Sequence, residues 1–276
     1  VDEHTIEAAS KAVDLGFISA TLVGDAKLIN DVCEKKGIDA SKFEIIGNPD
    51  ELKAVAQAVQ LVHDGEGDVL MKGLCSTDKF LRAILNKENG LLPPKGLLSH
   101  VGILESPNYH KLLFLTDMAV LPLPDFRQKI KQTNFVVKVA KSFGIAKPKV
   151  AFIAASEQVL DSMPACMEAA ALAKMVDRGQ IRGCIADGPL ALDVAIDNES
   201  VEIKKLVSPV AGDADCLVFP NIESANVFWK TNSKLSPGVR QAGMLVGTTA
   251  PCILASRADS VDTKLNSIAE AVMSIL

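Results

Sequence analysis

The sequence predicts an α/β protein, built from mostly parallel sheets with helices on both faces. Short β-branched runs alternate with longer helical stretches along the 276 residues, and this repeated order is typical of parallel βαβ units. The contents of hydrophobic residues, 48%, and of charged residues, 23%, are those of a globular chain with a proper core. We expect two α/β domains, one formed by residues 1–123 and 248–276 and the other by residues 124–247.

The first half of the chain reads as three strand-and-helix pairs followed by a hairpin. Apolar residues recur at helical spacing where helices are expected, as Leu52, Val55 and Val59 illustrate. The turn residues 106–109 join two apolar runs, which is typical of a β-hairpin. The predicted strands are 21–24, 43–47, 68–71, 99–104 and 112–116, and the predicted helices are 26–36, 50–62 and 77–85.

The second half repeats the same alternation after a proline-containing break at residues 121–125. The last strand and helix are expected to return to the first domain. The predicted strands are 150–153, 183–186, 216–219 and 252–255, and the predicted helices are 126–143, 164–176, 224–231 and 264–276.

Composition excludes several classes of protein. The net charge is −5, with no block of Lys or Arg, so no nucleic-acid partner is expected. No apolar run reaches the roughly eighteen residues that span a bilayer, and the first residues lack a signal-peptide pattern, so we expect no membrane association. The six widely spaced cysteines indicate reduced, buried thiols in a cytoplasmic protein.

Phosphate-loop, dinucleotide, zinc-protease and serine-hydrolase motifs are missing from the sequence.

Polar clusters instead follow several predicted strands, where ligands of open parallel sheets bind. Lys72 ends a strand, Thr77 starts the next helix and Arg82 follows within it. This order suits an anion, or alternatively a capped helix with a surface lysine. Thr116 precedes Asp117, which is either a base or a cap.

Three further positions are less specific. His100 follows the start of a strand and is either structural or catalytic. Asp187 precedes Gly-Pro, a natural turn. Asn226 and Lys230 lie one turn apart on a helix face, where they either bind a ligand or face solvent.

The richest cluster is Ser256-Arg257-Ala258-Asp259-Ser260, at the end of the last predicted strand. Asp259 or Ser260 is suited to cap the final helix. Arg257 is suited to grip a phosphate through its planar fork, aided by the free N–H groups and positive dipole end of the helix. The alternative is a helix cap beside a surface arginine.

Taken in order, these clusters resemble the phosphate acetyl/butyryltransferase family, and the chain looks closest to its butyryltransferase branch. The resemblance implies a two-domain fold with an interdomain cleft, related to the isocitrate and isopropylmalate dehydrogenases. It implies a homodimer that moves a short acyl group between coenzyme A and phosphate without a metal. Coenzyme A is then a substrate, and no permanently bound cofactor is expected. The stretches that carry it are 70–73, 97–100, 115–117, 187–193, 208–215 and 256–260.

The resemblance also implies roles for single residues. Ser256 and Arg257 would contact the phosphoryl group, and Arg82 matches a position that helps to bind coenzyme A. The family's proposed base, an Asp, falls on Thr263 here, which leaves Asp259 and Asp262 as candidates. Lys72 or Lys230 would support Arg257 in stabilising negative charge.

Other functions stay open on the sequence alone. A phosphate acetyltransferase differs from a butyryltransferase by a few methylenes in one pocket. A metal-dependent decarboxylating dehydrogenase has a related fold, but no convincing set of Asp ligands is found in the sequence. A non-catalytic protein that binds coenzyme A or phosphate is the alternative from another class.

Overall fold

The computed structural model describes residues 1–256 and 258–276, and these form two compact units. Unit 1 comprises Val1–Gly96 together with Ala242–Leu276, and unit 2 comprises Leu97–Gln241. By backbone contacts the chain therefore passes between units after Gly96 and Gln241, whereas the sequence placed its domain changes after residues 123 and 247.

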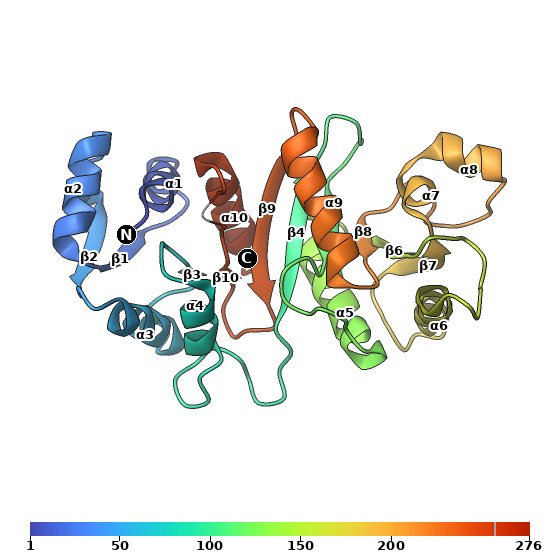
Figure 1. Ribbon diagram of the computed structural model, residues 1–276, viewed down its shortest axis with the longest axis horizontal. Helices are drawn as coiled ribbons and strands as arrows, with labels where there is room; N and C mark the ends of the chain where they lie inside the picture. Colours follow the sequence, from blue (N-terminus) through green and yellow to red (C-terminus); the bar gives the residue numbers. More distant parts are fainter. Residues whose placement is uncertain (257) are drawn as a thin grey trace. The chain divides into compact units, whose positions relative to one another are not determined.

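Unit 1 brings segments from both ends of the chain together. The strands β1 and β2 pair in parallel, β3 pairs in parallel with β10, and β10 pairs antiparallel with β9. Figure 1 shows the same joining of early and late segments, with β3 in teal beside β10 in dark red. Its elements are α1 (Glu3–Asp14), β1 (Ala20–Gly24), α2 (Ala26–Lys36), a 3₁₀ turn (Ala40–Lys42), β2 (Phe43–Gly47), α3 (Glu51–His63), β3 (Leu70–Met71), α4 (Thr77–Ile84), β10 (Cys252–Ile253) and α10 (Val261–Met273).

Local sequence signals fix where these helices begin and end. The carboxylate of Asp25 accepts hydrogen bonds from the backbone N–H groups of Lys27 and Leu28, at 2.9 and 3.2 Å. Asp50 caps α3 in the same way. Such caps satisfy donors that the first turn of a helix leaves unpaired. Gly37 ends α2 with a φ of 66°, a left-handed conformation that glycine adopts without steric cost.

One hydrophobic cluster of unit 1 lies between α1, α2 and the β1–β2 pair. Five residues with less than a tenth of their surface exposed form it. Helix α1 also packs against α10. The core residues are Ile6, Ala9, Ile29, Cys33 and Phe43.

Unit 2 contains five strands in the order β4-β5-β8-β6-β7. Strand β5 is antiparallel to β4, while the pairs β5–β8, β8–β6 and β6–β7 are parallel. Strand β9 (Arg240–Val246) crosses from unit 2 into unit 1. The elements of unit 2 are β4 (Ser99–Glu105), β5 (Leu113–Thr116), α5 (Phe126–Ser142), β6 (Lys149–Ile153), α6 (Pro164–Asp177), β7 (Ile185–Leu190), α7 (Leu192–Ile196), α8 (Asn198–Lys204), β8 (Cys216–Val218) and α9 (Ile222–Leu235).

Alternation along the strands of unit 2 sends side chains to both faces of the sheet. Leu115 and Leu217 lie in one cluster with Val194 of α7 and Ala225 of α9. Phe114 points to the opposite face, where it contacts Phe143, the residue just after α5. The two rings pack edge to face, with their centroids 5.5 Å apart. Helices therefore cover both faces, as the alternating sequence pattern predicts.

The predicted hairpin forms, because β4 pairs antiparallel with β5 from Gly102–Leu115 to Leu104–Leu113. The prediction for β7 was wrong in position. The sequence placed a strand at 183–186 and a turn at 187–189, whereas the strand runs over Ile185–Leu190. β7 is an edge strand, where a proline such as Pro189 can be accommodated because one side of the strand needs no ladder hydrogen bonds.

Candidate functional site

The segment that follows β10 forms a tight loop at the start of α10. The backbone N–H of Ser256 donates to Asp259 Oδ2 at 2.7 Å, and the N–H of Asp259 donates to the Ser256 carbonyl at 3.2 Å. Ser256 Oγ accepts a hydrogen bond from the N–H of Ala258 at 3.3 Å. Ser256 is exposed, so its hydroxyl is held at the surface by its own loop. Arg257 lies outside the residues that the structure describes.

Helix α10 begins directly after this loop. Ser260 is its cap, since Ser260 Oγ accepts a hydrogen bond from the N–H of Thr263 at 3.1 Å. Of the two caps that the sequence allowed, the structure uses Ser260, while Asp259 closes the loop instead. A helix start beside an exposed serine presents hydroxyl and N–H donors, and this arrangement suits an anionic group such as phosphate.

The two acidic candidates for the base have different surroundings. Asp259 is half-buried and lies against Ser256 through Oδ2, and no donor among residues 1–256 and 258–276 reaches its Oδ1. The side chain of Asp262 is 77% exposed and forms an ion pair of 3.3 Å with Lys11 on α1. Only Asp259 therefore shares its loop with Ser256.

Sequence reasoning missed Lys264, which lies under the same loop. Its side chain is 1% exposed, and Nζ donates to the Ser256 carbonyl at 3.2 Å. Lys264, Ile268 and Ala271 are all buried and are spaced by four and three residues on α10. A lysine in the apolar stripe of a helix was the signal that could have identified it.

The loop after β3 holds the candidates Lys72, Thr77 and Arg82. Lys72 is 3% exposed and its Nζ donates to the carbonyls of Gly73 and Cys75, both at 3.0 Å. Ser76 caps α4, and Thr77 is its first residue. Arg82 is exposed and pairs with Asp78 at 3.1 Å. Lys72 thus shapes its own loop, while Arg82 is free to reorient because a surface ion pair is weak.

In unit 2, Asp117 organises the loop that follows β5. Its side chain is buried, and its two oxygens accept five hydrogen bonds of 2.8–3.2 Å. A buried side chain with this many donors fixes the backbone around it. The sequence allowed two roles for Asp117, a base or a cap, and this geometry favours the cap. The donors are Ser99 Oγ and the backbone N–H groups of His100, Ala119, Val120 and Leu121.

His100, Thr116 and Asn226 contact or border the same loop. His100 Nδ1 lies 2.7 Å from Met118 Sδ, and burial lowers the pKa of the imidazole although the nearby Asp117 charge acts in the opposite direction. Thr116 Oγ1 is buried without a hydrogen-bond partner in the part of the chain that the structure describes. Asn226 Nδ2 donates to the Met118 carbonyl at 2.9 Å. Candidates from three separate parts of the sequence, at residues 100, 116–117 and 226, thus meet at residues 116–121.

Two candidates of unit 2 stand apart from that loop. Lys230 is exposed, one turn beyond Asn226 on α9. Asp187 is half-buried within β7, and its Oδ1 accepts a hydrogen bond from the N–H of Gly188 at 2.8 Å. The surroundings of Lys230 and Asp187 do not identify a ligand.

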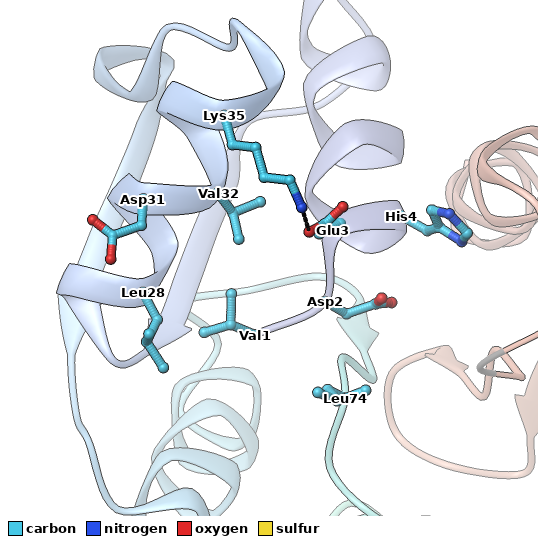
Figure 2. Close-up of a pocket in the computed structure, with 9 residues that line it drawn as sticks. All are labelled: Val1, Asp2, Glu3, His4, Leu28, Asp31, Val32, Lys35 and Leu74. Carbon is cyan, nitrogen blue, oxygen red and sulfur yellow. Dashed lines mark hydrogen bonds and ion pairs between the residues drawn. The ribbon is translucent and has the colours of Figure 1, made fainter.

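A cavity of about 520 Å³ opens in unit 1 between the first residues of the chain and α2. Figure 2 shows its lining, in which Lys35 donates to Glu3, while the carboxylate of Asp31 points away from this pair. None of the candidate residues that the structure describes lines it. The lining carries the carboxylates of Asp2, Glu3 and Asp31, and its lysine, Lys35, is already paired with Glu3, so the cavity is unsuited to a phosphate.

Two further findings concern the residues that the structure describes. They contain no group of three or more His, Cys, Asp or Glu side chains placed to hold a metal ion. They also contain no helix long and apolar enough to cross a membrane.

Comparison with solved structures defines the class of fold. A branched-chain phosphotransacylase from Enterococcus faecalis V583 superposes with a TM-score of 0.80 at 27% identity, covering 93% of this chain and 99% of that one. A putative 4-hydroxythreonine-4-phosphate dehydrogenase from Salmonella typhimurium gives a TM-score of 0.57 at 11% identity, covering 99% and 97% of the two chains. The second likeness concerns the fold alone, and the expected dehydrogenase-like α/β fold is confirmed.

Comparison of sequences identifies the family. The family described as "Phosphate acetyl/butaryl transferase" matches residues 50–272. The phosphate butyryltransferase of Clostridium acetobutylicum is 47% identical over 272 residues, covering 99% of this chain and 90% of the relative. A phosphate acetyltransferase of Rhizobium meliloti is 37% identical, covering 99% and 85%. This chain belongs to the phosphate acetyl/butyryltransferase family, and it is an enzyme of that family.

Proposed function

We propose that this protein transfers a short acyl group between coenzyme A and inorganic phosphate, with butyryl favoured. The observation that carries the proposal is the identity of 47% to a phosphate butyryltransferase along 99% of the chain. The exposed Ser256 loop at the start of α10 supplies a chemically suitable place for the phosphoryl group.

The reaction from acyl phosphate begins at the thiol of coenzyme A, which acts as a substrate. The sulfur attacks the acyl carbon, a C–S bond forms, and the C–O bond to phosphate breaks. The thiol proton must be removed, because a thiol of pKa about 8.5 is mostly protonated at neutral pH. We assign this proton to Asp259, since its carboxylate shares the loop of Ser256 and Oδ1 is the oxygen left to accept it.

Negative charge builds on the carbonyl oxygen and on the departing phosphate. Ser256 and the N-terminal end of α10 would stabilise the phosphate, with Arg257 as the cationic partner that the family resemblance implies. Direct attack in a complex that holds both substrates needs no covalent intermediate, and the shared binding supplies much of the rate. Losing one charge-stabilising donor in such a site typically raises the barrier by about 3 kcal/mol.

The remaining properties are proposed from the family. The protein would act as a homodimer in the cytoplasm, with no resident cofactor. Light scattering after size-exclusion chromatography tests the dimer, and a mass near that of one chain, 29.3 kDa, would contradict it.

The experiment for the function is a thiol-release assay with butyryl-CoA. We expect free coenzyme A to appear only when inorganic phosphate is present, and not when sulfate replaces it. Release without phosphate would indicate a thioesterase instead. Binding of butyryl-CoA with no release under either condition would favour the non-catalytic alternative.

A phosphate acetyltransferase is the second candidate, because the Rhizobium meliloti relative is 37% identical. A panel from acetyl-CoA to branched-chain acyl-CoA separates the two, since each methylene changes binding by about 1–3 kcal/mol. We expect kcat/KM to be highest for butyryl-CoA. A maximum at acetyl-CoA would reassign the enzyme to the acetyl branch.

A further inference from the structure

Lys264 is a buried cation that joins three parts of unit 1. Its Nζ lies 3.2 Å from the Ser256 carbonyl and 3.3 Å from Asp2 Oδ2. The Ser256 carbonyl also accepts the N–H of Asp259. The lysine therefore ties α10 to the Ser256 loop and to Asp2, which precedes α1 and is labelled in Figure 2.

This placement is unfavourable for the helix itself. Burying an ammonium group costs free energy unless it is paired and hydrogen-bonded. Lys264 also lies in the first turn of α10, where the positive end of the helix dipole disfavours a cation. A purely structural link between a carbonyl and a helix could use a neutral donor.

Asp2 compensates part of this cost. Burial would raise the pKa of Asp2, but the hydrogen bond from Thr5 and the charge of Lys264 outweigh burial and lower it. The Asp2 carboxylate is thus ionised at neutral pH and pairs with the Lys264 ammonium at 3.3 Å.

We propose that Lys264 is a positioning residue for phosphate, which fixes the Ser256 peptide and adds buried positive charge behind the anion site. The inference rests on the proposed function of the Ser256 loop. Because the side chain is 1% exposed, it cannot touch a bound phosphate and acts through Ser256. Burial also protects its charge from the salt screening that weakens surface lysines.

The test uses inorganic phosphate as the probe. Lys264→Met keeps the length of the side chain and removes the charge. We expect the KM for phosphate to rise about ten- to hundredfold, as for the loss of one hydrogen bond from a charged donor, while kcat falls less. The rise in melting temperature that phosphate causes in the wild type should shrink in parallel. Lys264→Arg should restore most of the phosphate affinity.

Two matched variants separate positioning from a merely structural role. Lys11→Met removes one charge from α1, where Lys11 pairs with Asp262 at the surface, and should leave the KM for phosphate unchanged. Asp2→Asn breaks the buried pair from its other end and keeps the lysine charge. It should lower the melting temperature without weakening phosphate binding.

The outcomes that overturn the inference are distinct from failure of the proposed function. An unchanged KM for phosphate in Lys264→Met overturns it, and so does an equal rise in Lys264→Met and Asp2→Asn. If Lys264→Met does not fold, the same comparison is made between Lys264→Gln and Lys264→Arg, where equal phosphate affinities overturn it. Wild-type protein that is stabilised by phosphate but shows no turnover would instead contradict the proposed function.

Discussion

Asp259 and Asp262 are three residues apart, but their carboxylates have different surroundings. Asp259 is held at 2.7 Å by the N–H of Ser256, whereas Asp262 is exposed and paired with Lys11. This difference favours Asp259 in the proposed role of base, which the sequence left open between the two.

Asp259→Asn should lower kcat about 10²- to 10⁴-fold, the usual contribution of a positioned base. Asp262→Asn should leave kcat unchanged. Because the base is needed to remove a thiol proton, the deficit of Asp259→Asn should shrink as the pH approaches the thiol pKa of about 8.5. Rates are measured from pH 6 to 9, and a deficit in Asp262→Asn alone would move the base to Asp262.

Glu270 is a second residue on α10 with unusual burial. It is 1% exposed, and neither carboxylate oxygen has a hydrogen-bond partner within the described residues. Burial raises its pKa well above the ordinary value of 4.5. The folded protein then holds a proton that the unfolded chain releases near pH 4.5, so stability falls as the pH rises from 4.5 through the raised pKa.

Glu270→Gln cannot ionise and should remove this loss. We expect it to match the wild type near pH 4 and to be more stable at pH 8, by about 1–3 kcal/mol for a buried unpaired group. Circular dichroism melts across this range measure the difference. The exposed Glu34→Gln on α2 is the control, and a difference between Glu270→Gln and wild type that does not vary with pH would be evidence against the account.

At the scale of elements, residues 116–121 connect three parts of unit 2. Asp117 accepts hydrogen bonds from β4 and from its own loop, His100 contacts Met118, and Asn226 of α9 donates to the Met118 carbonyl.

A second network lies before β6 and β8. Lys111 bridges Asp213 and Asp215. Burial alone would raise the pKa of Asp213, but hydrogen bonds from Lys111, Lys149 and His110 hold it well below its ordinary value. The two networks thus lie at opposite ends of β5, since Lys111 precedes this strand and Asp117 follows it.

Asp117→Asn should lower the free energy of unfolding by about 3 kcal/mol, because an amide replaces an acceptor of five hydrogen bonds and places its own donors against backbone N–H groups. Urea unfolding followed by fluorescence is suitable, since Trp229, the single tryptophan, packs in the same unit. The exposed Asp161→Asn should change stability by less than about 0.5 kcal/mol. Equal midpoints for both variants would contradict the role of Asp117.

In the molecule as a whole, the alternation and periodicity of apolar residues predicted most elements. Helices α2 and α5 begin at the predicted residues, where the structure shows Asp25 and Asp125 as their caps. The short helices α7 and α8 were missed because fewer than eight residues show little periodicity. β7 was displaced because Asp-Gly-Pro has the composition of a turn, yet here it lies within an edge strand.

The site was predictable only in part, for a related reason. Ser256 and Asp259 are only three residues apart in the sequence, so a local pattern identifies them. The contact of Lys264 with Asp2 joins residues from the two ends of the chain, and no local pattern contains both. The burial that turns Asp117 into a structural anchor likewise depends on packing between distant segments.

Release of coenzyme A from butyryl-CoA by wild type and by Arg257→Ala tests phosphate-dependent acyl transfer at the Ser256 loop. We expect wild type to release coenzyme A only with phosphate, and Arg257→Ala to lose about 10²- to 10³-fold in kcat while remaining folded. Arg178→Ala, an exposed arginine at the end of α6, should behave as wild type. Full activity of folded Arg257→Ala would contradict the account.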